Sequence, residues 1–220
     1  MAQQLTQPAR RHDLEENGAA RARAAIERGD REAALAAIDE ILAEEKPIHD
    51  LYGDMASSFL TFISERLGEE AVEEAWRYAA EDVWTPLFMS FKEQGNVEGL
   101  ASVFAAFLTS HRYDFEVWED EEKWTFAVNW CSSGERMLVE GKVADNPGDP
   151  NGHHRFGATK KAYPWSFDRV GLPYYDVHSA VWMRILPQEW GWQVLNVEYD
   201  TKANGQFAVT KYVLFKRPKS

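Results

Sequence analysis

The sequence predicts an α+β protein in which a helical N-terminal half packs on a mainly antiparallel sheet formed by the C-terminal half. Apolar residues recur at helical spacing up to about residue 110, and from Tyr113 they alternate with polar residues, as in strands. The first 110 residues carry 10 Lys and Arg against 21 Asp and Glu, whereas seven of the nine tryptophans follow residue 110. These contrasts indicate a solvated helical half and an aromatic, sheet-rich half.

Three regions follow from this division: a flexible N-terminus (1–12), a helical region (13–110) and a sheet region (111–220), the last two forming one compact domain. A composition of 45% hydrophobic and 27% charged residues is typical of a folded globule rather than a disordered chain. The formal charge of -12 argues against a nucleic-acid partner, which requires a basic surface. No apolar run approaches the roughly 20 residues that span a bilayer, and the start lacks a signal-peptide pattern. We therefore expect a cytoplasmic protein with no membrane partner.

The helical region begins with three predicted helices, at 14–28, 31–45 and 48–67. Asp30 is placed to cap the second helix, and Pro47 is placed in the first turn of the third, where its missing N–H costs nothing. The alanine-rich pair at 14–45 could pack on a second subunit, so a homo-oligomer is a further prediction. The third helix carries an apolar stripe made of Leu51, Met55, Phe59, Phe62 and Ile63.

The longest helical pattern, 69–91, should kink or break at Pro86, because the proline ring clashes with the preceding turn. A short apolar helix at 97–109 follows. Two hairpins then complete the predicted sheet, one between residues 113 and 130 and one that turns at Asn204-Gly205, where both residues accept positive φ.

The segment 131–192 between the hairpins holds the residues with chemical potential. Its main constellation joins Cys131 to Asp176 and His178. On an extended chain Asp176 and His178 share a face, whereas at a helix start they diverge by about 200°. If the three converge, the carboxylate orients His178 as an acid–base catalyst, or all three bind a zinc-like ion. The alternative is that Cys131 packs as a small hydrophobe and Asp176 caps a helix.

Further candidates surround this constellation. Tyr174 or Tyr175 could donate a hydrogen bond to a developing oxyanion, and His49 could face the sheet. Aromatic residues at this density suit a flat or apolar ligand, and arginines could bind its carboxylate. The candidate ligand-binding residues are Trp165, Tyr174, Trp182, Arg136 and Arg169, with Arg155 and Arg184 as further arginines. The histidines His153 and His154 lie in a Gly/Asn/Pro-rich loop, 145–157.

The layout resembles the L-2-amino-thiazoline-4-carboxylic acid hydrolase-like family over residues 48–216. The resemblance is carried by Gly68-Glu69-Glu70-Ala71, by the strand Trp124 to Cys131, and by the segment Tyr175 to Trp182. It implies hydrolase or lyase chemistry on a small molecule without a nucleotide cofactor. Related sequences carry a Cys-x-His-Cys pattern here, and this chain has Asp176 and Ser179 at the two cysteine positions.

The leading interpretation is a hydrolase or lyase that acts on a small aromatic or carboxylated compound by acid–base catalysis in an aromatic-lined pocket. Its cofactor is either absent or a single divalent metal ion. A non-catalytic small-molecule-binding or sensor domain is the first alternative. The second is a metal-free lyase that abstracts a proton next to an aromatic ring.

Overall fold

The computed structural model describes residues 16–143 and 155–219, so the predicted flexible terminus (1–12) and most of the loop that holds His153 and His154 lie outside the described residues. The chain divides within its longest helix into two compact units, residues 1–49 and 50–220. The helices that follow residue 50 thus belong to the same unit as the sheet. Each unit is described by itself.

The first unit contains helix α2 (Gly18–Glu27) and the start of helix α3 (Arg31–Leu67). The side chain of Asn17 caps α2 by accepting a hydrogen bond from the Ala20 N–H at 2.9 Å. Asp30 accepts from the Ala33 N–H at 3.0 Å, which confirms the predicted cap.

The predicted helix boundary at Pro47 is wrong, because α3 continues through this proline. The proline ring removes one backbone hydrogen bond, the one to the carbonyl of Ala43. Because residues 42–48 are exposed, water can donate a hydrogen bond to that carbonyl instead. The neighbouring Glu44, Glu45 and Lys46 favour helix. The local cost of Pro47 is therefore tolerated within one continuous helix.

In the second unit, helices α4 (Glu70–Val83), α5 (Thr85–Gln94) and α6 (Val97–Ser110) follow α3. Pro86 lies in the first turn of α5, so the predicted break in the long helical pattern is confirmed. Asn96 caps α6 by accepting from the Gly99 N–H at 2.8 Å.

The four strands form one antiparallel sheet in the order β1-β2-β4-β3, which confirms the predicted α+β class. The two predicted hairpins are the outer pairs of this sheet, and β2 pairs with β4 between them. The strands are β1 (Asp114–Glu119), β2 (Lys123–Trp130), β3 (Leu195–Thr201) and β4 (Phe207–Phe215). Helix α6 packs on the two central strands, because Phe104 contacts the rings of Phe126 and Tyr212.

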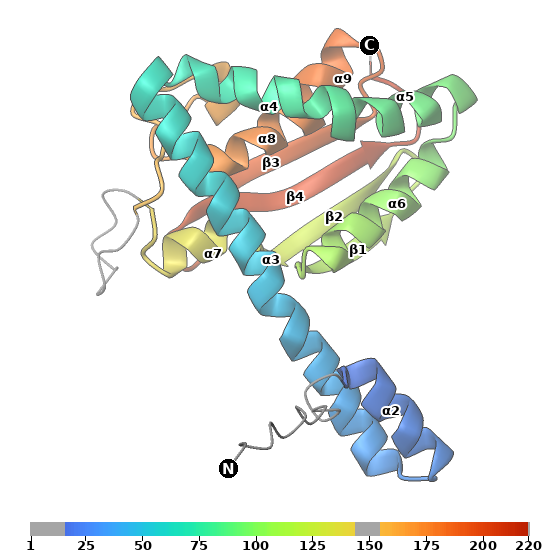
Figure 1. Ribbon diagram of the computed structural model, residues 1–220. Coiled ribbons are helices and arrows are strands. Elements are labelled where there is room, and N and C mark those ends of the chain that lie inside the picture. The colour runs from blue at the N-terminus through green and yellow to red at the C-terminus, as the bar shows by residue number, and fades with distance from the viewer. Residues whose placement is uncertain (1–15, 144–154, 220) are drawn as a thin grey trace, which may run out of the picture. The chain divides into compact units, whose positions relative to one another are not determined.

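Between β2 and β3 the chain forms short helical pieces. They are α7 (Gly134–Val139), η1 (Pro164–Ser166), η2 (Tyr174–Asp176), α8 (Val177–Ala180), η3 (Val181–Ile185, a π-helical turn) and α9 (Leu186–Glu189). In Figure 1, α8 and α9 lie with α4 on one side of the sheet. Within the described part of the chain, no helix combines the length and apolar character needed to cross a membrane.

Candidate functional site

The second unit encloses a cavity of about 280 Å³ between helices α4 and α6, the η3 turn and the sheet. One part of its wall is apolar and the other carries hydrogen-bonding groups. The apolar part consists of Trp76, Val83, Trp84, Phe104, Phe107, Leu108, Trp182 and Met183. The polar part consists of His111, Tyr113, Ser133, Tyr175, His178 and Tyr212.

Three tryptophans of the apolar wall are fixed by their indole N–H groups. Trp76 donates to the backbone carbonyl of Tyr174 at 2.9 Å, Trp84 donates to that of Trp182 at 2.8 Å, and Trp182 donates to that of Trp76 at 2.8 Å. The ring of Trp182 meets Trp76 edge-on at 5.3 Å and stacks on Trp84 at 6.3 Å. Because each indole N–H already has a partner, the rings present apolar surface in fixed orientations.

His178 is placed in the wall by helix α8. Its Nδ1 lies 2.5 Å from the backbone carbonyl oxygen of Tyr175, which can only accept, so Nδ1 carries the proton and Nε2 remains an acceptor. Burial lowers the pKa of His178 to about 4, and the bond to Tyr175 opposes that shift only in part. The imidazole is therefore neutral at neutral pH, with rings of Trp76 and Trp182 around it at 5.0 and 5.4 Å.

Asp176 and Cys131 lie behind the polar wall, each 1% exposed. Burial raises the pKa of Asp176 to about 7, although hydrogen bonds from the Tyr199 hydroxyl and the Gly134 backbone oppose the shift. Its Oδ2 has no hydrogen-bond partner. Among the described residues, it is the one buried side-chain oxygen or nitrogen atom that lacks a partner. Cys131 donates from its thiol to the Tyr113 hydroxyl at 3.1 Å, and burial raises the pKa of that thiol to about 11.

Tyrosine hydroxyls connect this buried carboxyl group to the cavity. Tyr199 bonds to Asp176 and to Ser179, and Tyr212 bonds to Ser179 and to Tyr113. Of these residues, Tyr113 and Tyr212 line the cavity. Tyrosine and serine hydroxyl groups therefore lie between the Asp176 carboxyl group and the cavity wall.

The constellation predicted from Cys131, Asp176 and His178 is brought together only in part. Asp176 ends the η2 turn and His178 lies in α8, so the helical alternative holds and the two side chains diverge. The ring of His178 is oriented by the Tyr175 carbonyl rather than by Asp176. In residues 16–143 and 155–219, no three His, Cys, Asp or Glu side chains form a group that could hold a metal ion.

The other predicted ligand residues divide between the cavity and the core. Tyr175 and Trp182 line the cavity. Trp165 instead stacks on Tyr163 at 4.2 Å in the core. Tyr174 bonds to Ser64 and Glu69, both at 2.9 Å, and faces a separate, more polar hollow of about 540 Å³. His49 ends the first unit and is not among the residues that line the cavity.

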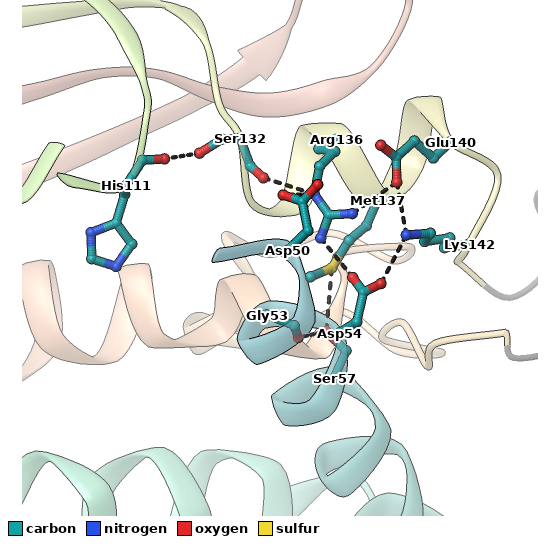
Figure 2. Close-up of polar contacts among 10 residues, drawn as sticks. All are labelled: Asp50, Gly53, Asp54, Ser57, His111, Ser132, Arg136, Met137, Glu140 and Lys142. Carbon is teal, nitrogen blue, oxygen red and sulfur yellow. Dashed lines mark hydrogen bonds and ion pairs between the residues drawn. The ribbon is translucent and has the colours of Figure 1, made fainter. Parts of the chain in front are cut away.

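The prediction that Arg136 binds a substrate carboxylate is wrong, because protein carboxylates already surround it. Figure 2 shows its guanidinium among three acidic side chains: it lies 3.3 Å from Asp50, 2.6 Å from Asp54 and 2.8 Å from Glu140. Lys142 joins the latter two at 2.8 and 2.9 Å. The buried Arg136 thus attaches α7 to α3 and is not available to a ligand.

The remaining predicted arginines also lie away from the cavity. Arg169 is exposed and its guanidinium stacks on Phe207 at 4.4 Å. Arg184 donates to the Pro164 carbonyl and lies over Phe167, and Arg155 borders the polar hollow. In the part of the chain that the structure describes, no arginine or lysine lines the cavity.

Comparison of this chain with known protein families, with curated proteins and with solved structures finds no match. The case for a function therefore rests on the cavity and the groups around it.

Proposed function

We propose that residues 50–220 bind a small, uncharged aromatic molecule in the cavity. The observation that carries this proposal is the wall of three tryptophans held in place by their own N–H bonds. Fixed aromatic surfaces bind a flat ligand without the entropy loss of ordering side chains on binding. A volume of about 280 Å³ suits a molecule of one or two rings.

The absence of arginine and lysine from the described cavity wall favours a ligand without a carboxylate. Among the residues that the structure describes, the lining contains no Lys or Arg, and the pKa of His178 is lowered to about 4 by burial, so the His178 ring is neutral. A bound carboxylate would find no arginine or lysine among the described lining residues to offset the cost of its desolvation. A hydroxyl or N–H group, by contrast, can exchange hydrogen bonds with Tyr113, Ser133 or Tyr212.

The test compares matched neutral and anionic probes by isothermal titration calorimetry. Phenol and indole are expected to bind at least tenfold more tightly than benzoate and indole-3-carboxylate. Equal affinity for the neutral and the anionic probes contradicts the proposal that the ligand is uncharged. Failure of both neutral probes to bind at millimolar concentration contradicts an aromatic-binding function.

A substitution at the cavity rim provides the structural control. Val83 lines the cavity but is 64% exposed, so Val83→Trp adds a ring there without disturbing the core. We expect it to weaken indole binding at least tenfold. The matched substitution Val117→Trp, on strand β1 at a position that is also exposed, should leave binding unchanged. Equal effects of the two substitutions contradict binding in this cavity.

A second candidate function is acid–base catalysis on the bound molecule, of the hydrolase or lyase type. The observation that favours it is the carboxyl group of Asp176, whose pKa is raised to about 7 by burial and which hydroxyl groups connect to the cavity. A group that titrates near neutrality and is connected to a cavity is typical of acid–base sites. His178 would accept a hydrogen bond through Nε2 and orient the substrate.

Phenyl acetate and benzamide, which are neutral and aromatic, test this second function by chromatographic detection of their hydrolysis products. Turnover that is lost in Asp176→Asn while phenol binding is retained supports catalysis through this group. Binding without turnover of any probe favours the non-catalytic domain. The zinc-like ion and the metal-free lyase remain predictions. Adding a chelator distinguishes them, since it abolishes a metal-dependent activity and leaves a metal-free activity unchanged.

A further inference from the structure

Helix α3 shows an unusual arrangement in the second unit, because its large apolar side chains face outward. Leu51, Tyr52, Met55, Phe59 and Phe62 recur at helical spacing and form what we term the outer stripe. Their exposed fractions run from 42% at Met55 to 62% at Tyr52.

The inner face of the same helix carries small and hydroxyl-bearing residues. Gly53, Ser57, Leu60 and Ser64 are the buried positions. The Ser57 hydroxyl bonds to the Gly53 carbonyl at 2.8 Å and approaches the sulfur of Met137 at 3.2 Å, as Figure 2 shows, and the Ser64 hydroxyl bonds to Tyr174 at 2.9 Å. Apart from Leu60, packing of α3 inside this unit therefore uses short side chains and leaves the large apolar ones uncovered.

We propose that the outer stripe is the interface of a homodimer, in which α3 of one chain packs antiparallel on α3 of a second copy. Monomeric proteins rarely expose apolar patches of more than a few hundred Å². Five large side chains that are about half exposed supply about 100 Å² each. Two copies together bury about 1,000 Å², which reaches the lower limit of specific interfaces.

The spacing of the stripe makes it complementary to itself. Positions 52, 55, 59 and 62 are symmetric about residue 57, so reversal of the helix brings apolar positions opposite apolar positions. Around a two-fold axis at that residue, Phe62 meets Tyr52 of the second copy and Phe59 meets Met55. Isologous interfaces require this self-complementarity.

The distribution of charge along α3 permits a second copy of this chain at this place. Each chain carries a net charge of -12, so two copies repel each other over most of their surface. Residues 55–64 contain no ionisable side chain, which lets two stripes meet without placing like charges in contact. Added salt should therefore strengthen the dimer, because it screens the remaining repulsion.

Sedimentation equilibrium of the full chain tests the dimer. We expect a mass twice the 25.2 kDa of one chain at micromolar concentration, and a dissociation constant at least 100-fold higher in Phe59→Glu. The control is Tyr78→Glu, at a tyrosine on α4 that is 73% exposed and outside the stripe, and it should remain dimeric. A wild-type monomer at tens of micromolar, or a dimer that Phe59→Glu does not weaken, overturns the proposal.

A mixing experiment tests the antiparallel arrangement. Phe62→Glu and Tyr52→Arg should each dissociate the dimer when alone. Mixed, they should form a heterodimer, because the glutamate of one chain meets the arginine of the other while the second Tyr52–Phe62 contact stays native. In a parallel pair each substituted position would face its own counterpart, so failure to re-form the dimer overturns the antiparallel packing.

Discussion

Two carboxyl groups, one on helix α7 and one packed against its first residue, are equally buried but differ in their partners. Glu135 and Asp176 are each 1% exposed. Glu135 accepts hydrogen bonds from Lys202 at 2.7 Å, from Asn204 at 2.8 Å and from the Cys131 N–H at 2.9 Å. Asp176 has only the Tyr199 hydroxyl and the Gly134 backbone, and its Oδ2 has no partner.

The difference separates a structural role from a functional one. A buried charge with a cation and well-placed donors holds the chain in place, as Glu135 does for the β3–β4 turn and the end of β2. A buried acid without such partners retains its proton to higher pH and becomes a group that titrates near neutrality. Asp176 is of the second kind, and it lies behind the cavity.

The largest effect is expected from Glu135→Gln. The new amide NH₂ must face one or more of three groups that all donate hydrogen bonds, and Lys202 loses its counter-ion. We expect a loss of about 3 kcal/mol in the free energy of unfolding, measured by urea denaturation. The double substitution with Lys202→Met should recover part of that loss. If the losses caused by Glu135→Gln and Lys202→Met simply add, the two side chains are not coupled. Glu135 would then not differ from Asp176 in having a stabilising cation.

Gly134→Ala should have the next largest effect, because a Cβ at this position would lie 1.8 Å from Oδ2 of Asp176. The backbone or the carboxyl group must shift, and such overpacking costs about 1–3 kcal/mol. Gly53→Ala is the matched control, since its nearest neighbour is the flexible end of Met137 at 3.3 Å. Equal stability of the two variants would show that Asp176 moves freely.

Asp176→Asn should change how stability depends on pH. The wild-type carboxyl group has a pKa of about 7 when folded and 3.8 as its ordinary value, so it contributes stability that is lost as pH rises through this range. The slope is about 1.4 kcal/mol per pH unit, and the asparagine variant lacks it. Denaturation at a series of pH values measures this slope. A wild-type and variant curve that run parallel from pH 4 to 7 would contradict the raised pKa.

His178 contributes a slope of opposite sign over nearly the same range. Its pKa is lowered from 6.5 to about 4, so its stabilising contribution is present above pH 6.5 and is lost as pH falls. Between pH 4 and 6.5 the two groups partly cancel in the wild type. We expect His178→Asn, which can keep the bond to the Tyr175 carbonyl, to become more stable on acidification, whereas Asp176→Asn becomes less stable. Variants that both follow the wild-type curve would refute this cancellation.

The elements of the fold followed from the sequence where local signals agree. The cap at Asp30, the break at Pro86 and the turn at Asn204-Gly205 each depend on a few neighbouring residues, and the structure has all three. Pro47 shows the limit of such signals. Its cost as a residue inside a helix is real, but exposure to water and the favourable neighbours outweigh it.

The site was harder to predict, because its residues come from separate elements. Tyr175, His178 and Trp182, which line the cavity, are predicted as site residues through their clustering in one segment. Trp76, Trp84 and Tyr113 are not predicted as site residues, because the first two lie in a helical pattern and the third in a strand pattern, far in sequence from the segment 131–192. The prediction that arginines bind a ligand carboxylate failed at Arg136 for a related reason. Sequence alone does not show that Arg136 has three acidic partners. The exposure of the large apolar side chains on α3 likewise cannot be predicted from the sequence, because it depends on which elements pack against the helix.

The smallest predicted effect concerns Cys131, whose thiol shares this buried region. The pKa of the thiol is raised to about 11 by burial, with a further rise from the nearby Asp176 charge, and the side chain is 1% exposed. Because the thiolate is the reactive form, a disulfide reagent such as dithionitrobenzoate at pH 8 should label it only as fast as the protein unfolds. Tyr113→Phe, which removes the acceptor of the thiol, should lower stability by about 1 kcal/mol and speed labelling through more frequent opening. Rapid labelling of the folded wild type would instead mean that the groups behind the polar wall open to solvent, and the low-polarity surroundings that raise the pKa of Asp176 would then be lost as well.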